Sequence, residues 1–432
     1  MAKIGDRVQL ITSNTTEKGI LMPSPKKEIM LLKLDTGYNL GFKKTEVKSI
    51  KLLESAKEVI PPIKKIASNK NLPTISILHT GGTIASKVDY RTGGVTTAFS
   101  PEELITLFPE LSSLANINSE LVAQMWSDDL RFSHFSLIAR KIEEHVCKGV
   151  KGIIIGMGTD NLAVAAAALS FIIEKTPIPI IFVGAQRSSD RGSSDAGMNL
   201  ICAAEFIVKT DFAGVAICMH QSAEDLNCLI FPANKTQKLH SSRRDAFKVV
   251  NTEAIAQVEY NSRKITFIQK DYSKNGDKLV IKPKMENKVG LLKIHVNMFP
   301  EQFSFYQGYK GLIIEGTGLG HTPGQMPNAE CAIHKKIYPA IKELIKSGCV
   351  VVMTTQCIFG SVNMNVYDKG RDLLELGVIS GKDMLANTAL VKLSWLLANY
   401  PKSEAEKLIN QNLRGEINAR LSYSEDFLEG KK

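Results

Sequence analysis

The sequence lacks most of the patterns that mark metalloproteins, redox proteins and membrane proteins. Its seven cysteines are widely spaced and form no C-x-x-C pair, so neither a zinc ribbon nor a thioredoxin-type redox pair is indicated. Its eight histidines form no H-E-x-x-H motif, and we expect no metal site. The longest nearly apolar run, residues 162–173, is shorter than the about 20 residues that a membrane helix requires. The first residues contain no apolar segment of the secretory type, so we expect a cytoplasmic protein without membrane contact.

Acidic residues are fewer than basic residues, and most of the difference lies near the beginning of the sequence. The chain has 432 residues, with 54 Lys plus Arg against 44 Asp plus Glu and a formal net charge of +10. Residues 1–70 hold 14 basic and 7 acidic residues, a net of +7, so the rest of the chain is nearly neutral. A basic module on a neutral body indicates a polyanion-binding function, although ordinary solvated surface charge explains the excess equally well.

Residues 1–55 are predicted to form a small all-β module. Short runs of strand character at 8–12, 29–34 and 38–42 are bounded by turn residues. Asp35-Thr36-Gly37 lies between two of these runs and is a hairpin signal, which favours a barrel of the SH3 or Tudor type. Residues 56–73, with Pro61-Pro62 and Lys64-Lys65, have the composition of an extended linker.

From residue 74 onwards, short β-rich runs alternate with helical spacing. This alternation predicts a large α/β domain with a mostly parallel sheet over residues 74–267. A polar connection at 268–289 and a smaller α/β domain at 290–432 are expected to follow, with strands near 290–294, 312–315 and 350–354. In the large domain, strands are expected at 75–78, 121–125, 152–155, 178–183 and 214–219, and helices at 131–147, 162–173, 194–208 and after the Ser100-Pro101-Glu102-Glu103 cap.

Two glycine-rich segments that carry hydroxyl groups follow predicted strands. His79-Thr80-Gly81-Gly82-Thr83 follows the first strand, and Gly156-Met157-Gly158-Thr159-Asp160 follows the strand at 152–155. Because parallel strands of one sheet end at the same edge, we expect Thr83, Thr159 and Asp160 to meet there. A Thr hydroxyl becomes a nucleophile when a base removes its proton, and a lysine of lowered pKa can serve as that base. Each segment alone is equally compatible with a plain turn or a helix cap.

In combination these segments are far more specific. Thr80 to Ser86 (T-G-G-T-I-A-S), Gly158-Thr159-Asp160 (G-T-D) and Val183 to Arg187 (V-G-A-Q-R) resemble the amidohydrolases of the L-asparaginase family, over roughly residues 73–400. The resemblance implies a two-domain α/β fold and amide hydrolysis by a threonine nucleophile. It implies no metal ion and no organic cofactor.

The resemblance also assigns roles to individual residues. Thr83 matches the primary threonine on the loop after the first strand, Thr159 the second threonine, and Asp160 the adjacent carboxylate. The catalytic lysine of the family falls in the segment Asn234 to His240, where Lys238 is the better match and Lys235 the alternative. Substrate-binding positions implied in the same way are Ser127, Asp128, Gly82, Gly158 and Ala185, with Asp128 in place of the Gln or Glu that the family usually carries.

Two further stretches resemble one branch of that family, the archaeal D subunits of glutamyl-tRNA(Gln) amidotransferase. They are Gly5-Asp6-Arg7-Val8 with residues 32–39, and residues 362–367 with Gly370-Arg371 and residues 374–379. The resemblance implies a glutaminase or asparaginase that supplies ammonia to a partner, the E subunit of the amidotransferase. The complex would use ATP and Mg²⁺ to amidate Glu-tRNA(Gln), and this chain would form a homodimer within a heterotetramer.

Other interpretations stay open at this point. A free cytosolic L-asparaginase would need none of residues 1–70, and a non-catalytic binding protein could retain the fold. Gly316-Thr317-Gly318-Leu319-Gly320 differs from the dinucleotide-binding fingerprint and is interpreted as a strand-end loop. Arg243-Arg244 is either solvated surface or a phosphate-binding pair.

Overall fold

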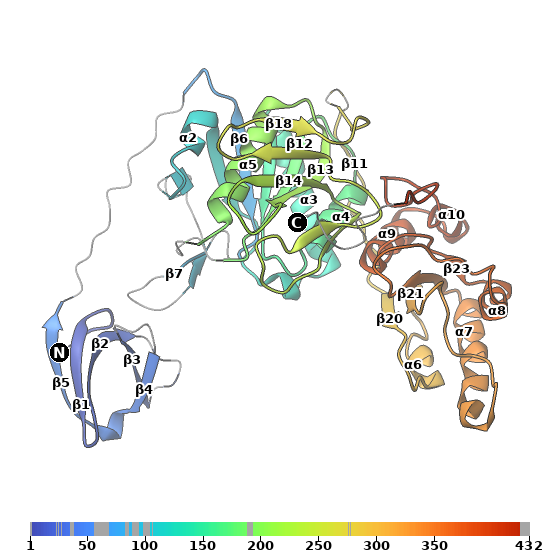
Figure 1. Ribbon diagram of the computed structural model, residues 1–432, viewed down its shortest axis with the longest axis horizontal. Coiled ribbons are helices and arrows are strands. Elements are labelled where there is room, and N and C mark those ends of the chain that lie inside the picture. The colour runs from blue at the N-terminus through green and yellow to red at the C-terminus, as the bar shows by residue number, and fades with distance from the viewer. Residues whose placement is uncertain are drawn as a thin grey trace.

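The computed structural model describes three α/β or all-β bodies along the chain (Figure 1). The described residues are 2–22, 24, 26, 28–34, 39–55, 69–82, 86–88, 95–97, 104–105, 107–187, 193–274, 276 and 278–423. Among them, no helix is long and apolar enough to cross a bilayer. The predicted cap at Ser100 to Glu103 lies outside these residues.

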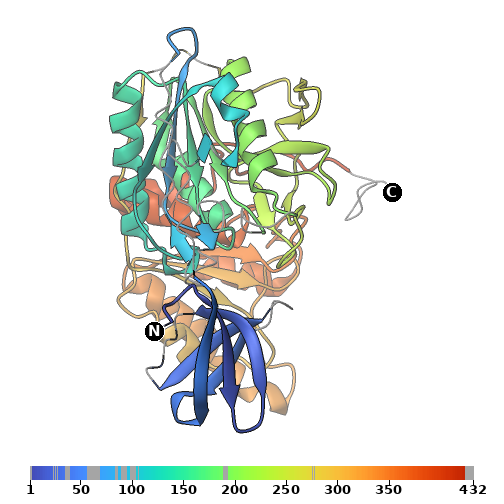
Figure 2. The same cartoon turned by 90° about the vertical axis from the view of Figure 1, so that its left-hand side faces the viewer.

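The N-terminal body is a five-stranded antiparallel sheet that curves around a small core (Figure 2). Val8, Leu10, Leu21 and Leu32 alternate with outward-facing polar residues and fill that core, which is the period-2 pattern of a half-buried sheet. The expected all-β fold is confirmed. Its strands, in the order β4-β3-β2-β1-β5, are β1 (Arg7–Thr12), β2 (Thr16–Met22), β3 (Ile29–Leu34), β4 (Asn39–Lys43) and β5 (Val47–Glu54), with a 3₁₀ turn, η1 (Lys44–Glu46), before β5.

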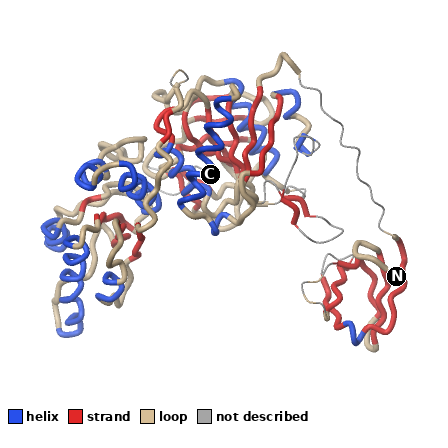
Figure 3. Tube along the Cα trace, turned by 180° about the vertical axis from the view of Figure 1, so that it is seen from behind, coloured by secondary structure: helices blue, strands red, loops and turns tan. Residues whose placement is uncertain are grey.

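The described residues of the large body form an eight-stranded sheet covered by helices on both faces (Figure 3). Five strands are parallel and three at one edge are antiparallel, so the expected mostly parallel α/β fold is confirmed. From the antiparallel edge the order is β18 (Ile265–Phe267), β17 (Ala256–Glu259), β14 (Asn227–Pro232), β13 (Gly214–His220), β12 (Pro179–Val183), β10 (Gly152–Gly156), β6 (Thr74–His79) and β9 (Asn116–Leu121).

Two hydrophobic cores lie on opposite faces of this sheet. One contains the buried sides of α3 (Phe132–Cys147) and α4 (Leu162–Ile172), and the other those of α2 (Leu111–Leu114) and α5 (Ala196–Lys209). Strands β10 and β12 are buried along their whole length, which is why they appear in the sequence as unbroken apolar runs.

One predicted strand is wrong in position. The sequence predicts a strand at 121–125, but the strand β9 covers Asn116–Leu121 and ends where that run begins. Among the described strands β9 lies at the edge of the sheet and pairs with β6 alone, so it tolerates the polar sequence N-I-N-S-E-L. Burial on one face alone leaves too weak an apolar signal to locate such a strand.

The smaller body is a four-stranded parallel sheet whose helix α9 (Ala386–Asn399) packs against α4 of the large body. Phe171 of α4 and Trp395 of α9 stack with ring centroids 6.0 Å apart, so the two bodies share one apolar core. The remaining elements are β20 (Val289–Lys293), β21 (Gly311–Gly316), β22 (Val350–Thr355), β23 (Ile379–Ser380), α6 (Pro300–Ser304), η4 (Ala329–Lys336), α7 (Ile337–Lys346), α8 (Asp368–Leu376) and α10 (Lys402–Leu408).

Three two-stranded pairings complete the described structure. The most relevant to the site is the hairpin of β15 (Thr236–Lys238) and β16 (Phe247–Val249), which lies beside the carboxyl ends of the parallel strands. The others are β7 (Ser86–Val88) with β8 (Val95–Thr97), and β11 (Ile173–Lys175) with β19 (Val280–Ile281).

Candidate active site

The glycine-rich segments after β6 and β10 touch each other through their backbones. The two strands are parallel neighbours, and the amide of Thr80 donates to the carbonyl of Gly156 at 3.0 Å. Gly82 has φ +82°, and a Cβ there would lie 2.4 Å from the amide nitrogen of Gly158. Only glycine permits that approach, so the sequence pattern G-G-T encodes the contact between the two loops. Thr83, the next residue but outside the described range, keeps its assignment as a prediction.

Lys238 connects the β15–β16 hairpin to the loop after β10. Its Nζ donates to Oγ1 of Thr159 at 2.9 Å and to Oδ1 of Asp160 at 2.8 Å. The lysine side chain is 12% exposed and Thr159 is buried, whereas the Asp160 side chain is 70% exposed. The arrangement places a hydroxyl, an amine that can accept its proton, and an open carboxylate within hydrogen-bond reach of one another.

Lys235, the alternative lysine, faces elsewhere. It is 1% exposed and forms an ion pair with Asp383 of the smaller body. Burial lowers the pKa of the Lys235 amine, although Asp383 opposes that shift. Because its amine is held there and Lys238 touches Thr159, the geometry favours Lys238 as the catalytic lysine.

Ser127 also lies against the loop after β10. It is buried in the turn η3 (Ser127–Asp129), and a Cβ on Gly158 would lie 3.0 Å from its Oγ. The Ser127 carbonyl accepts from Nδ2 of Asn161 at 2.9 Å, which ties the turn to the start of α4. Asp128 follows at the exposed surface. The structure therefore brings together Ser127 and Gly158, two of the predicted substrate-binding positions.

The V-G-A-Q-R segment, Val183 to Arg187, lies at the end of β12 and also contacts this site. A Cβ on Gly184 would lie 2.8 Å from Cγ2 of Thr159, so the segment lies directly against that threonine. Ala185, a predicted substrate contact, is buried at the same strand end. All the predicted site residues that the structure describes thus belong to loops at one edge of the sheet or to the adjoining hairpin.

Beneath this segment lies a buried polar network that the sequence reasoning missed. Asp195 accepts from the amides of Gln186 and Arg187, both at 3.0 Å, and Nδ2 of Asn199 donates to the carbonyl of Gly184 at 3.0 Å. His220 Nδ1 lies 2.6 Å from Oδ1 of Asn199. The available signal for this network in the sequence was the pair Asp195 and Asn199, which lie four residues apart at the start of α5.

The described part of the chain gives no evidence for a metal site or for catalysis by a histidine. It holds no group of three His, Cys, Asp or Glu side chains placed to bind a metal ion. His79 ends β6 beside the site, and burial lowers the pKa of its imidazole. Its Nδ1 has no hydrogen-bond partner among the residues that the structure describes, so the neutral ring is the form that this position favours.

Family models match three successive parts of the chain. Residues 74–272 match the N-terminal asparaginase domain, residues 288–408 the glutaminase/asparaginase C-terminal domain, and residues 2–53 the GatD N-terminal domain. The two asparaginase models cover the large and the smaller bodies, and the third covers the five-stranded barrel. The three matches therefore follow the order of the three bodies.

Curated relatives resemble the chain from end to end. The D subunit of glutamyl-tRNA(Gln) amidotransferase from Methanococcus maripaludis strain S2 is 42% identical over 427 residues, which is 97% of this chain and 99% of that protein. The D subunit from Pyrococcus furiosus is 42% identical over 429 residues, 96% of this chain and 95% of that protein. The matches cover nearly all of both chains and therefore include the N-terminal body, which a comparison with asparaginases alone would leave unexplained.

Solved structures resemble the two α/β bodies. The thermostable L-asparaginase from Thermococcus kodakarensis superposes with a TM-score of 0.71 at 27% identity, covering 80% of this chain and all of that one. L-asparaginase I from Vibrio cholerae gives a TM-score of 0.67 at 27% identity, covering 80% of this chain and 99% of that one. The asparaginase fold is therefore present with additional chain attached.

Proposed function

The chain belongs to the family of glutamyl-tRNA(Gln) amidotransferase D subunits, and from that premise we propose that it releases ammonia from glutamine, or from asparagine, through the Lys238 site. The observation that carries this proposal is the contact of the Lys238 amine with Thr159 and Asp160. The full-length match to these D subunits favours this function over that of a free asparaginase.

The proposed reaction is acyl transfer through a threonine ester. A threonine hydroxyl, Thr83 or Thr159, attacks the side-chain amide carbon as its proton passes to the Lys238 amine. The C–N bond breaks, the nitrogen leaves as ammonia after taking up a proton, and water then hydrolyses the ester to give glutamate or aspartate. Backbone N–H groups of the glycine loops would stabilise the oxyanion, a contribution of about 3–4 kcal/mol for one strong donor.

The surrounding residues would hold the substrate. Ser127 is buried against Gly158, where its hydroxyl can bind the substrate carboxylate. The exposed carboxylate of Asp160 can bind the substrate amino group, with Asp128 as a second candidate for that contact. Gly82, Gly158 and Ala185 would line the amide end.

The complex supplies the remaining chemistry in this proposal. The ammonia passes to the E subunit, which uses ATP and Mg²⁺ to activate the glutamate of Glu-tRNA(Gln), so the present chain needs no cofactor. The chain pairs with itself as a homodimer inside a heterotetramer in the cytoplasm. Hydrolysis of glutamine is low until the partner and the mischarged tRNA are bound, because free ammonia would otherwise be lost.

The test is glutamine-dependent conversion of Glu-tRNA(Gln) to Gln-tRNA(Gln), measured with and without the E subunit and alongside ammonia release. We expect conversion only when both proteins are present, and faster ammonia release once tRNA and partner are added. Rapid asparagine hydrolysis by the isolated chain, unchanged by either addition, would instead identify a free asparaginase.

A further inference from the structure

The hairpin that carries Lys238 is fixed at its base by the smaller body. Asn234 and Lys235 immediately precede β15, and both are buried. The carbonyl of Asn234 accepts from Oγ1 of Thr388 in α9 at 3.0 Å. The amine of Lys235 pairs with the carboxylate of Asp383, just before α9, and donates to the Asp383 carbonyl at 3.2 Å. One end of the hairpin is thus held by groups of the other body.

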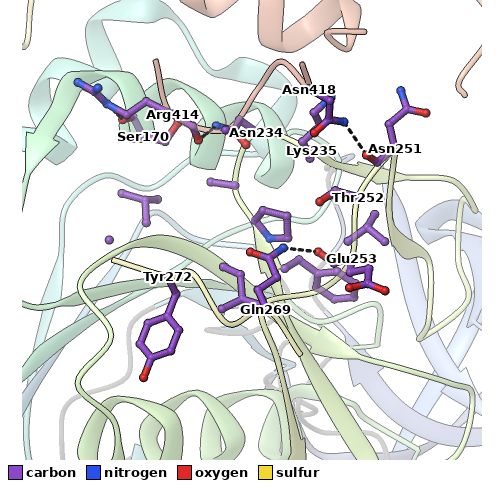
Figure 4. Close-up of a pocket in the computed structure, with 18 of the residues that line it drawn as sticks. Ser170, Asn234, Lys235, Asn251, Thr252, Glu253, Gln269, Tyr272, Arg414 and Asn418 are labelled. Carbon is purple, nitrogen blue, oxygen red and sulfur yellow. Dashed lines mark hydrogen bonds between the residues drawn. The ribbon is translucent and has the colours of Figure 1, made fainter. Parts of the chain in front are cut away.

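The opposite end of the hairpin is held in the same way. Asn251 follows β16, and its side chain exchanges two hydrogen bonds with the backbone of Gly360 in the smaller body, at 2.9 and 3.0 Å. Asn418 then joins the two ends, because its Nδ2 donates to the carbonyl of Asn251 at 2.7 Å (Figure 4) and to Oδ2 of Asp383 at 2.9 Å. We call Lys235, Asn251, Asp383 and Asn418 the hairpin clamp.

The segment that contributes Asn418 is itself firmly held. It follows α10 and lies beyond residue 408, where the match to the glutaminase/asparaginase C-terminal domain ends. Glu416 forms a fully buried ion pair with Lys392 of α9 at 2.6 Å, and Nζ of Lys392 also donates to the carbonyls of Ile409 and Gln411. Residues 409–418 are therefore a fixed structural element that reaches from the smaller body to the hairpin.

The clamp borders an open space on one side of the hairpin base. A cavity of about 1510 Å³ lies against it, and Asn234, Lys235, Asn251 and Asn418 are among the residues that line the cavity (Figure 4). The apolar side chains of Ala246 and Phe247 hold the hairpin in the core that the two bodies share, and on the side of the cavity the polar contacts of the clamp hold its base. Buried charges that pair in this way hold a geometry even where they add little to stability.

A shift of the hairpin base reaches the Lys238 amine directly. Lys235 and Lys238 lie three positions apart in extended chain, about 10 Å, and β15 is held in register by its pairing with β16. A misplacement of a catalytic group by about 1 Å can cost about 100-fold in rate.

We propose that Lys235 and Asp383 are positioning residues for Lys238, so that the smaller body and residues 409–418 set the place of the catalytic amine. This inference rests on the proposed role of the Lys238 site. It separates two tasks: the loops after β6, β10 and β12 bind the substrate, and the clamp aligns the amine. Loss of the clamp should therefore lower kcat and leave KM nearly unchanged.

The test compares the double variant Lys235→Met/Asp383→Leu with wild type in the complete complex with the E subunit and Glu-tRNA(Gln). Replacing both charges together avoids an unpaired buried ion. We expect kcat for ammonia release from glutamine to fall 10- to 100-fold while KM for glutamine stays within threefold. The matched control is Tyr400→Phe, which removes a hydroxyl that contacts Lys282 and Glu174 between the same two bodies away from the hairpin. It should leave both constants within twofold.

A milder variant covers the case in which the double variant does not fold. Asn418→Ala removes only the link between Asp383 and Asn251 and should lower kcat three- to tenfold with KM unchanged. Wild-type kcat in every folded clamp variant, with Lys238→Ala inactive, overturns the positioning role alone. Full activity of Lys238→Ala would instead refute the proposed site itself.

Discussion

The amine of Lys238 lies 2.9 Å from the hydroxyl of Thr159, although 79 positions separate the two residues in the sequence. The contact joins the loop after the parallel strand β10 to the β15–β16 hairpin, which follows the antiparallel strand β14. Because both side chains are largely buried, their hydrogen bond is shielded from competing water. Removing the Lys238 amine therefore tests directly whether ammonia release depends on this contact.

Lys238→Met should abolish measurable ammonia release while leaving the fold intact. General-base catalysis contributes about 10²–10⁴-fold, so kcat should fall by at least that factor. Lys248→Met is the matched control, since Lys248 lies on the partner strand β16 and is half exposed. The control should keep wild-type kcat in the coupled assay. Equal losses in the two variants would show that the hairpin matters only as structure.

Gly82→Ala should inactivate the enzyme through a backbone collision. Its Cβ would meet the amide of Gly158 at 2.4 Å, so the two site loops must separate. Gly149→Ala separates that collision from conformational strain, because Gly149 also has positive φ (+76°) but nothing within 4 Å of its Cβ position. The control should cost about 1–2 kcal/mol of stability and leave kcat unchanged. Thermal unfolding and ammonia release, measured together, distinguish the two effects.

The Asp195 carboxylate should matter chiefly for substrate binding. It accepts the amides of Gln186 and Arg187, and it is fully buried beneath the segment that contains Ala185. Asp195→Ala removes the acceptor of the half-buried Gln186 amide and of the Arg187 amide, where a fully buried unpaired group would cost about 1–3 kcal/mol, and lets that segment move. We expect KM for glutamine to rise at least tenfold, with a smaller change in kcat. A variant that binds glutamine normally would show that the network only stabilises the fold.

The sequence allowed the fold class to be predicted, and it indicated the candidate site residues, because both depend on strong local patterns. Strands β10 and β12 are buried on both faces and therefore appear as apolar runs, and the glycines of the site loops mark close backbone contacts. The edge strand β9 was misplaced and the barrel strands β2 and β5 were missed, because a strand with one exposed face carries polar residues that weaken its signal.

Long-range polar contacts were beyond sequence reasoning for a different reason. The choice between Lys235 and Lys238 depended on which lysine faces Thr159 and which faces Asp383, 148 positions away. Both lysines lie in one short segment, and nothing in its composition distinguishes an interdomain ion pair from a catalytic contact. The clamp at Asn418 was hidden for the same reason, because no local pattern shows where a C-terminal segment returns.

His79 should make stability depend on pH. Burial lowers the pKa of its imidazole below the ordinary value of 6.5, so the unfolded chain binds a proton more readily than the folded protein. The stability that results is present above pH 6.5 and is lost as the pH falls toward the lowered folded-state pKa. Urea unfolding at about pH 7.5, 6.5 and 5.5, on either side of the ordinary pKa, should show a steeper loss for wild type than for His79→Asn. Parallel curves for the two proteins would exclude His79 as the source.

The basic N-terminal body should contribute to tRNA binding by the complex. Lys18 of β2 and Lys51 of β5 both pair in register with Gln9 of β1, so they share the outer face of the barrel, and both are exposed. Lys43 and Lys44 add two exposed charges at the end of β4. Four exposed lysines on so small a body can contact the phosphate backbone of an RNA.

Replacing Lys18, Lys43, Lys44 and Lys51 with Glu should weaken binding of Glu-tRNA(Gln) to the complex and flatten its salt dependence. Each lost phosphate contact lowers the slope of log K against log salt by about 0.7–0.9. Fluorescence anisotropy over about 50 to 300 mM salt, a range that shortens the Debye length by more than half, measures both effects. Lys335→Glu/Lys342→Glu reverses exposed charges on the smaller body and serves as the control. A slope that stays at its wild-type value would assign tRNA binding to the partner alone and leave the +7 of residues 1–70 as solvated surface charge.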